Sequence, residues 1–242
     1  MSGGLAPFET RPLTPTRTWN PVTGCTHRCS YCYAMKLIET RLKDTPKYRN
    51  GFNPTFHPDE LRRALGFRPT DVVFVVDMGD LFSDGVPDEW ITAVLRSAMK
   101  SHARFLFLTK NPARYRRFLD LFPPRSVLGA TIETNRDDLT TTISKAPPPS
   151  ERYVALRDLP WAYKYVSVEP VMDFDLDELV RWIREISPVT VHVGYDNWSS
   201  RLPEPPLWKV RELITRLSSF TRVTLGTLRE PWYERWARSR GL

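Results

Sequence analysis

Short apolar segments alternate with helical segments along most of this 242-residue chain, and the alternation limits the folds it can adopt. The apolar segments are rich in β-branched residues and have the length of buried strands. They are residues 72–76 (VVFVV), 105–108 (FLFL), 127–132 (VLGATI), 165–168 (YVSV), 189–193 (VTVHV) and 223–225 (VTL), with a weaker segment near 16–19. Strands that alternate with helices form parallel sheets with right-handed crossovers. Six or seven such units are fewer than the eight of a closed barrel. The sequence therefore predicts an α/β fold, an open partial (βα)6 TIM-like barrel that can carry an additional C-terminal strand and helix.

The segments between the predicted strands carry helix signals. Residues 175–186 (DLDELVRWIREI) and 206–220 (PLWKVRELITRLSSF) each place apolar side chains on one helical face. No linker or low-complexity segment divides the chain, so we expect one domain over residues 1–242. Within it we distinguish a cysteine-rich loop at 20–34 and a basic C-terminal extension at about 201–242.

The bulk composition indicates a soluble globular protein, with 41% hydrophobic and 26% charged residues. No apolar run approaches the roughly 20 residues that cross a bilayer. Residues 1–8 lack the basic stretch and long apolar core of a secretory signal. We therefore expect a cytoplasmic protein with no membrane partner.

Polar side chains follow the predicted strands. They are Asp77, Asp80, Thr109, Lys110, Glu133, Glu169, Asp196 and Asn197. In βα barrels the carboxyl ends of the strands converge on one face and build the active site. Asp and Asn at such positions also serve as helix caps, whereas Glu is a poor cap. This favours Glu133 and Glu169 as residues that face a central cavity.

All three cysteines of the chain lie within eight residues, as Cys25, Cys29 and Cys32 in a C-x3-C-x2-C pattern. Three thiolates can hold three irons of a cubane cluster that normally takes four cysteines, so one iron would remain open to another ligand. The alternative is a structural zinc ion, with His27 or His57 as the fourth ligand.

A C-x3-C-x2-C loop with an aromatic residue, Tyr31, before the last cysteine resembles the radical S-adenosylmethionine (SAM) superfamily. Further segments resemble a phage and prokaryotic radical-SAM-like family of unknown function. They are residues 19–25 (WNPVTGC), 32–34 (CYA), 80–82 (DLF), 86–90 (VPDEW), 108–110 (LTK), 133–135 (ETN) and 167–170 (SVEP). The CYA and LTK segments are also similar to the spore photoproduct lyase group, which repairs DNA.

The resemblance implies a radical SAM enzyme with two cofactors, a [4Fe-4S] cluster on the three cysteines and SAM on its open iron. The reduced cluster would cleave SAM to a 5′-deoxyadenosyl radical that abstracts hydrogen from a substrate. By this resemblance Tyr31 lies along the adenine, Gly79 and Asp80 receive the methionyl amine, and Lys110 pairs with the SAM carboxylate or a substrate anion. The remaining expected SAM contacts, to ribose or carboxylate, are Thr131, Glu133, Ser167 and Glu169.

The net charge of +7 favours a polyanionic partner. Residues 201–242 carry nine Lys and Arg against four Glu, so DNA or RNA is the expected partner of this extension, and nucleic acid or a nucleotide is the expected substrate. The chemistry also implies a reductant of the flavodoxin or ferredoxin kind. The alternative function is a nucleic-acid-binding protein whose zinc or iron–sulfur loop is structural and performs no radical chemistry.

Overall fold

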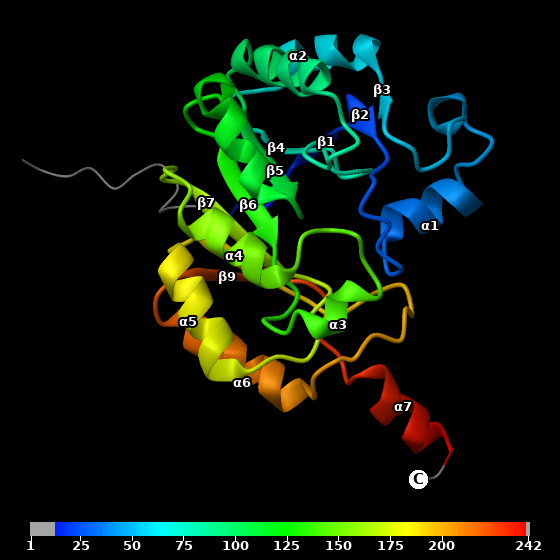
Figure 1. Ribbon diagram of the computed structural model, residues 1–242, viewed down its shortest axis with the longest axis vertical. Helices are drawn as coiled ribbons and strands as arrows, with labels where there is room; N and C mark the ends of the chain where they lie inside the picture. The colour runs from blue at the N-terminus through cyan, green and yellow to red at the C-terminus, as the bar shows by residue number, and fades with distance from the viewer. Residues whose placement is uncertain (1–12, 241–242) are drawn as a thin grey trace, which may run out of the picture.

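The computed structural model describes residues 13–240, and its main feature is a parallel sheet curled into an open half-barrel (Figure 1). The strands lie in the order β1-β4-β5-β6-β7-β8-β9, and each neighbouring pair is parallel. Their bounds are β1 Arg17–Trp19, β4 Val72–Val75, β5 Arg104–Thr109, β6 Val127–Thr131, β7 Lys164–Val168, β8 Thr190–Val193 and β9 Arg222–Leu225. This confirms the predicted α/β partial barrel, in which β9 is the additional C-terminal strand.

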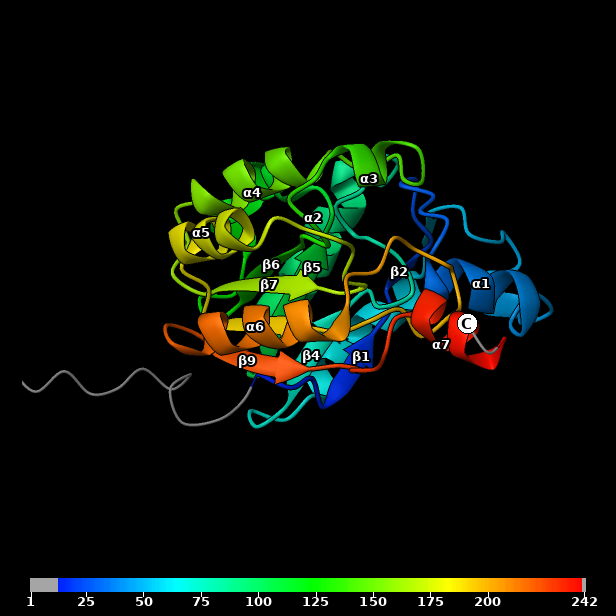
Figure 2. The same cartoon turned by 90° about the horizontal axis from the view of Figure 1, so that it is seen from below.

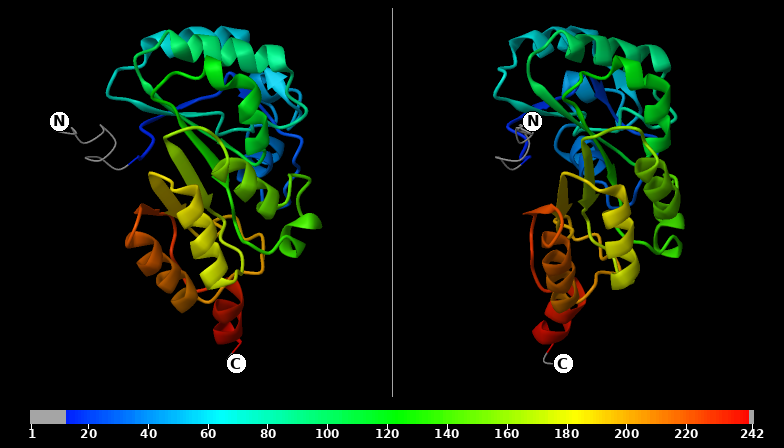
Figure 3. Two further views of the ribbon diagram at one scale, coloured as in Figure 1. Left: turned by 60° about the vertical axis from the view of Figure 1, so that its left-hand side comes forward. Right: turned by 90° about the vertical axis from the view of Figure 1, so that its left-hand side faces the viewer.

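Helices cover the outer face of the curled sheet (Figure 3). They are α2 Asp88–Met99, η3 Pro112–Leu121, α4 Pro149–Arg157, α5 Leu176–Ile186 and α6 Leu207–Ser218. The two amphipathic helices predicted from the sequence are α5 and α6, while η3 is a 3-10 helix. None of the helices within residues 13–240 is long and apolar enough to span a membrane.

Side chains alternate between the two faces of each strand, which separates a large outer core from a smaller core inside the half-barrel. On β7, Val166 and Val168 pack in the outer core under the helices, whereas Tyr165 packs in the inner one. Because side chains along a strand repeat every two residues, each strand sends one set of side chains into the interior. The inner core comprises Leu13, Val72, Leu106, Val127 and Tyr165, with Phe74, Leu108, Tyr163 and Val189 packed against it.

The remaining elements are short, and two helices lie beyond the carboxyl ends of the strands (Figure 2). These two are α1 Tyr33–Thr40, directly after the cysteines, and α7 Trp232–Ser239. The others are β2 Val22–Thr23, η1 Pro46–Tyr48, β3 Thr55–Phe56, η2 Pro58–Gly66 and α3 Asp138–Thr141. The indole of Trp232 donates to the Leu202 carbonyl at 2.7 Å, so it ties the C-terminal helix to the loop before α6.

Candidate functional site

A cavity of about 280 Å³ opens at the carboxyl ends of the strands, and Cys25, Cys29 and Cys32 all line it. Seven of the eight residues predicted to bind SAM also line this cavity, namely Tyr31, Gly79, Asp80, Lys110, Thr131, Ser167 and Glu169. Glu133 is absent from its walls, since its side chain is fully buried. The fold thus brings together residues that are up to 144 positions apart in the sequence.

Backbone N–H groups point at two of the three cysteine sulfurs. The His27 amide donates to Cys25 Sγ at 3.3 Å, and the Met35 amide donates to Cys32 Sγ at 3.4 Å. Cys32 is the N-cap of α1, where the positive end of the helix dipole favours an anion. These donors suit thiolates, which are the form of cysteine that binds metal.

Burial raises the pKa of the Cys25 thiol well above its usual range and also raises the pKa of Cys32. Without a bound cation, therefore, these thiols favour the neutral form. A metal centre deprotonates the cysteines that coordinate it. The donor set, three free thiols on one cavity with amides aimed at two of them, fits an iron–sulfur cluster held by three protein sulfurs.

The cysteine loop is fastened to the sheet by a close approach of two glycines. Gly24 N donates to the Met78 carbonyl at 2.9 Å, and Asp80 N donates to the Gly24 carbonyl at 3.3 Å. A Cβ on Gly79 would lie 2.4 Å from that Gly24 oxygen, so the approach excludes any side chain. Gly24 itself has φ of 80°, in the region that favours glycine.

The segment after α3 braces the loop from its other side. Ser30 N donates to the Ile143 carbonyl at 2.8 Å, and Lys145 N donates to the His27 carbonyl at 2.7 Å. Between these two bonds, Ser144 Oγ lies 3.1 Å from Cys29 Sγ. Backbone bonds to the segment after β4 and to the segment after α3 therefore hold the three cysteines in place.

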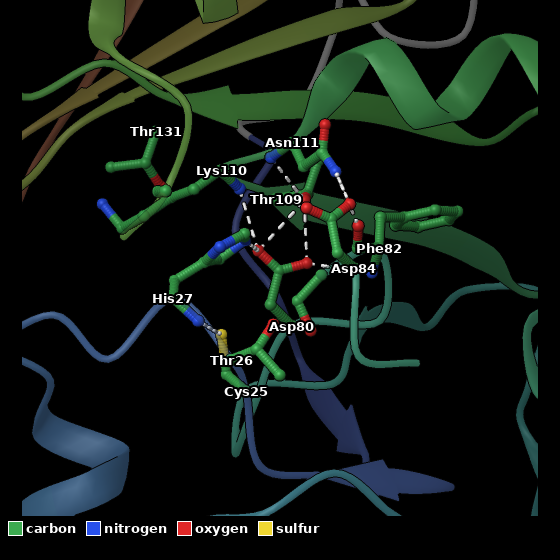
Figure 4. A network of polar contacts seen from close by, with 12 residues as sticks. Cys25, Thr26, His27, Asp80, Phe82, Asp84, Thr109, Lys110, Asn111 and Thr131 are labelled. Carbon is green, nitrogen blue, oxygen red and sulfur yellow. Dashed lines mark hydrogen bonds and ion pairs between the residues drawn. The ribbon is translucent and has the colours of Figure 1, made fainter. Parts of the chain in front are cut away.

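Asp80 is the centre of a buried network that joins the cysteine loop to β5 (Figure 4). Its carboxylate accepts from His27 Nε2 at 3.1 Å, from Thr109 Oγ1 at 2.7 Å and from the Lys110 amide at 2.9 Å. It also accepts from the Phe82 amide at 2.9 Å. Burial alone would raise the pKa of Asp80. The hydrogen bonds outweigh burial and hold the pKa below its usual range, and the bond from His27 contributes most to this lowering. Both oxygens are occupied by protein donors, so Asp80 acts as an anchor of the loop.

Glu133 joins three residues beneath the cavity. It accepts from Tyr31 Oη and from Lys110 Nζ, and Arg152 Nη1 donates to its other oxygen at 2.6 Å. Glu133 and Arg152 have fully buried side chains, and Lys110 Nζ lies 5.2 Å from the centre of the Tyr31 ring. Burial lowers the pKa of Lys110 to about 8. When Lys110 and Arg152 are both protonated, their two positive charges face the one negative charge of Glu133. This group of side chains then carries an excess positive charge.

Several residues of the cavity wall were not among the predicted SAM contacts. Asp77 bonds Asn20 through one oxygen at 2.5 Å, and burial raises the pKa of its carboxyl group. Tyr33 and Trp198, from α1 and from the loop after β8, stack with ring centres 6.5 Å apart. Asp77 directly follows a predicted strand, and this position is the sequence signal that could have identified it as a residue of the site. The pairing of Tyr33 with Trp198 has no sequence signal, because 164 residues separate them in the chain.

The two histidines named as alternative zinc ligands lie in different places. His57 Nε2 bonds Thr23 Oγ1 at 2.9 Å, and His57 is not on the cavity wall. His27, Cys25 and Asp80 place potential ligand atoms within 4.8 Å of one another. A single metal ion on these three residues would compete with a cluster, since it would take one of the three sulfurs.

The half-barrel is the fold of the similar solved structures, which are radical SAM enzymes. A spore photoproduct lyase mutant with dinucleoside spore photoproduct aligns with TM-score 0.55 and 13% identity, over 84% of this chain and 61% of that chain. Residues 14–187 match the family described as "Protein of unknown function (DUF5131)", and the chain belongs to this family.

Two further solved structures share the fold. A spore photoproduct lyase mutant with bound AdoMet and dinucleoside spore photoproduct has TM-score 0.56 and 13% identity, over 91% of this chain and 69% of that chain. Streptococcus suis SuiB bound to precursor peptide SuiA has TM-score 0.56 and 10% identity, over 88% of this chain and 49% of that chain. This chain thus spans about six-tenths of the lyase and half of SuiB. No curated protein matches its sequence.

Proposed function

We propose that this chain is a radical SAM enzyme that holds a [4Fe-4S] cluster through Cys25, Cys29 and Cys32 and binds SAM beside it. The observation that carries the proposal is that all three thiols share one strand-end cavity with seven residues predicted to bind SAM. When bound, the two cofactors supply reductive cleavage of a sulfur–carbon bond and removal of a hydrogen atom from a substrate.

The anionic and cationic groups on the cavity wall match the two ends of the methionyl group of SAM. Asp77 has one oxygen bonded to Asn20, and burial raises the pKa of its carboxyl group, so a bound ammonium would stabilise the ionised form. We therefore assign the SAM ammonium to Asp77 and the Gly79 backbone, in place of the occupied Asp80. The excess positive charge at Lys110 suits the SAM carboxylate, and Glu133 supports Lys110 from below.

The nucleoside part of SAM has its own set of residues. Thr131 and Ser167 are paired in register on β6 and β7, and both line the cavity, so their hydroxyls suit the ribose hydroxyls. The Tyr31 ring lies over Lys110 Nζ, and its hydroxyl is fixed by Glu133. We assign this immobilised ring, with its backbone, to the adenine.

The test is anaerobic reconstitution followed by reduction with SAM. We expect a brown protein with about four irons and four sulfides per chain, and formation of 5′-deoxyadenosine after reduction. Cys29→Ala should assemble no intact cluster and form no 5′-deoxyadenosine, while Ser30→Ala, one residue away, should retain both properties. A wild-type protein that binds a full cluster and SAM but never forms 5′-deoxyadenosine would overturn the proposal.

A second candidate function rests on the placement of Cys25, His27 and Asp80 within 4.8 Å of one another. These residues suit a single structural metal ion in a nucleic-acid-binding protein without radical chemistry. The same reconstitution separates the two candidates, because this one predicts a colourless protein with one zinc ion. Against it, the Asp80 oxygens already accept four kinds of protein donor.

Partners follow from the proposed chemistry and from charge. Reduction of the cluster requires an electron donor, which we propose to be a flavodoxin- or ferredoxin-like protein. The basic extension is less available to DNA or RNA than its composition indicates, because several of its cations are paired. These pairs are Lys209–Asp173, Arg216–Asp177, Arg229–Glu204 and Arg238–Glu230. We therefore place nucleic-acid contact at the cavity rather than along residues 201–242.

A further inference from the structure

A second cavity of about 260 Å³ lies inside the half-barrel and adjoins the cysteine-lined cavity. The two cavities share four wall residues, Phe74, Leu108, Ser167 and Glu169. The proposed cofactor residues occupy the first cavity, so the second is left for another molecule. A radical enzyme needs its substrate next to the cofactor and shielded from water, and the second cavity is the adjoining interior space.

A row of polar side chains runs across the sheet from one cavity to the other. Strand register pairs Thr131 of β6 with Ser167 of β7, Ser167 with His192 of β8, and His192 with Thr224 of β9. Thr131 lines the first cavity, Ser167 lines both, and His192 and Thr224 line the second. Because residues paired in a parallel sheet point to the same face, these four form a continuous polar strip in an otherwise apolar interior.

At its β8–β9 end, the strip joins a linked group of three residues, Glu169, His192 and Thr224. His192 Nε2 lies 3.2 Å from Glu169 Oε2, and His192 Nδ1 lies 3.0 Å from Thr224 Oγ1. The side chains of Glu169 and His192 retain 32% and 23% of their exposure, so both remain open to the cavities. Within residues 13–240, the ion pair to His192 is the one polar side-chain contact of Glu169.

Two glycines make room for this pair. A Cβ on Gly194 would lie 2.5 Å from Glu169 Oε1, and a Cβ on Gly226 would lie 2.6 Å from the same oxygen. A Cβ on Gly226 would also lie 2.9 Å from His192 Nε2. The carboxylate therefore lies in a space that any larger residue at these two positions, directly after β8 and β9, would fill. In the part of the chain that the structure describes, one of its oxygens lacks a protein donor.

We propose that the second cavity is the substrate pocket and that it takes a nucleobase, whose edge is read by Glu169, with His192 holding the Glu169 carboxylate in place. This rests on the proposed function, which supplies the reaction in the adjoining cavity. Apolar and aromatic side chains form the remaining walls, which suits the faces of a planar ring. They are Leu13, Pro15, Phe74, Leu106, Leu108, Tyr165 and Leu225, with Thr14 beside them.

The size and charge of the pocket favour a base over a longer ligand. Its volume of about 260 Å³ is near the roughly 300 Å³ at which ligand pockets begin, which suits a small ligand such as one ring system. The Glu169 oxygen that does not face His192 can accept from an N–H group on the edge of a base. The net charge of +7 attracts the phosphates attached to that base. By this assignment Glu169 contacts substrate and not SAM.

The test measures nucleoside binding and SAM binding on the same reconstituted protein. The probes are thymidine, deoxycytidine, deoxyadenosine and deoxyguanosine, with N-acetylalaninamide as a peptide-like comparison, all by ligand-observed NMR. We expect at least one nucleoside to bind, and Glu169→Gln to weaken that binding at least tenfold while SAM affinity falls much less. Glu212→Gln, on the exposed face of α6, should leave nucleoside binding unchanged.

Gly226→Ala provides a second variant, because it removes no polar group but places a Cβ against both Glu169 and His192. It should also weaken nucleoside binding at least tenfold. The inference is overturned if no nucleoside binds, if Glu169→Gln affects SAM and nucleosides equally, or if N-acetylalaninamide binds in their place. Glu169-dependent nucleoside binding to a protein that forms no 5′-deoxyadenosine would retain the pocket and reject the proposed radical chemistry.

Discussion

Replacing Glu133 with alanine tests whether this residue supports the site from within the core. Its carboxylate pairs with Arg152 and Lys110 and accepts from Tyr31, and both Glu133 and Arg152 have no exposed side-chain area. Glu133→Ala leaves Arg152 buried without its carboxylate. Breaking one side of a buried ion pair costs about 3–5 kcal/mol.

The expected loss is large enough to measure as a thermal shift. For a chain of about this size, 1 kcal/mol corresponds to about 2–4 °C, so 3–5 kcal/mol predicts a fall of about 6–20 °C in the unfolding midpoint. The assay is thermal unfolding at pH 7 without metal, which keeps cluster stability out of the measurement. Glu178→Ala, an exposed carboxylate on α5, should shift the midpoint by no more than about 2 °C.

A double variant distinguishes the effect of leaving the Arg152 charge unpaired from the effect of losing the Glu133 side-chain volume. When both members of a buried pair are replaced by apolar residues, the protein is often as stable as before. Glu133→Leu with Arg152→Met should therefore be more stable than Glu133→Ala. If Glu133→Ala unfolds within about 2 °C of wild type, Glu133 is not a buried anchor, and its direct role in SAM binding, expected from the sequence, is favoured again.

Three further variants test other parts of the site. Gly79→Ala places a Cβ 2.4 Å from the Gly24 oxygen and should lower the iron content after reconstitution, whereas Gly66→Ala, which meets nothing within 4 Å, should not; equal iron contents would contradict the role of the glycine contact. Asp77→Asn should weaken SAM binding about tenfold or more with iron content retained, and an unchanged affinity would remove Asp77 from the site. Hydrogen bonding from Arg114 lowers the pKa of Asp88, so the folded protein gains stability above the ordinary pKa of 3.8 and loses it as pH falls through the lowered value. The free energies of unfolding of Asp88→Asn and wild type should therefore differ at pH 7 by under about 1 kcal/mol, and their thermal midpoints should converge near pH 2; a constant difference would contradict the pairing.

The sheet and the placement of the site could be predicted from the sequence because both depend on local patterns. Each β-branched segment became a strand, and residues directly after strands converged because parallel strands end on one side. The cysteine spacing marked the cysteine-rich loop for the same reason, since the three thiols are neighbours in the chain. These features need no knowledge of which distant residues meet.

The different roles of the strand-end carboxylates could not be predicted, because each role depends on residues that are far away in the sequence. Glu133 and Glu169 look alike in sequence, each directly after a buried strand. Arg152, from a helix that begins at the last of three prolines, reaches Glu133 and makes it part of the core. Glu169 instead meets His192 and the two glycines directly after β8 and β9, which leave it open.

The number of donors around each carboxylate separates residues that hold the site from residues that can bind something else. A carboxylate offers about four lone-pair positions, and Asp80 has filled its positions with donors from the cysteine loop, β5 and the segment after β4. Filling them fixes the loop, and it also leaves no acceptor for a ligand. Within residues 13–240, Asp77 and Glu169 each have one oxygen to which no other residue donates, and both lie on a cavity wall. Each can therefore accept from a cation or an N–H group. Asp77 lines the first cavity and Glu169 lines both, which is why we assign SAM to the first and the substrate to the second.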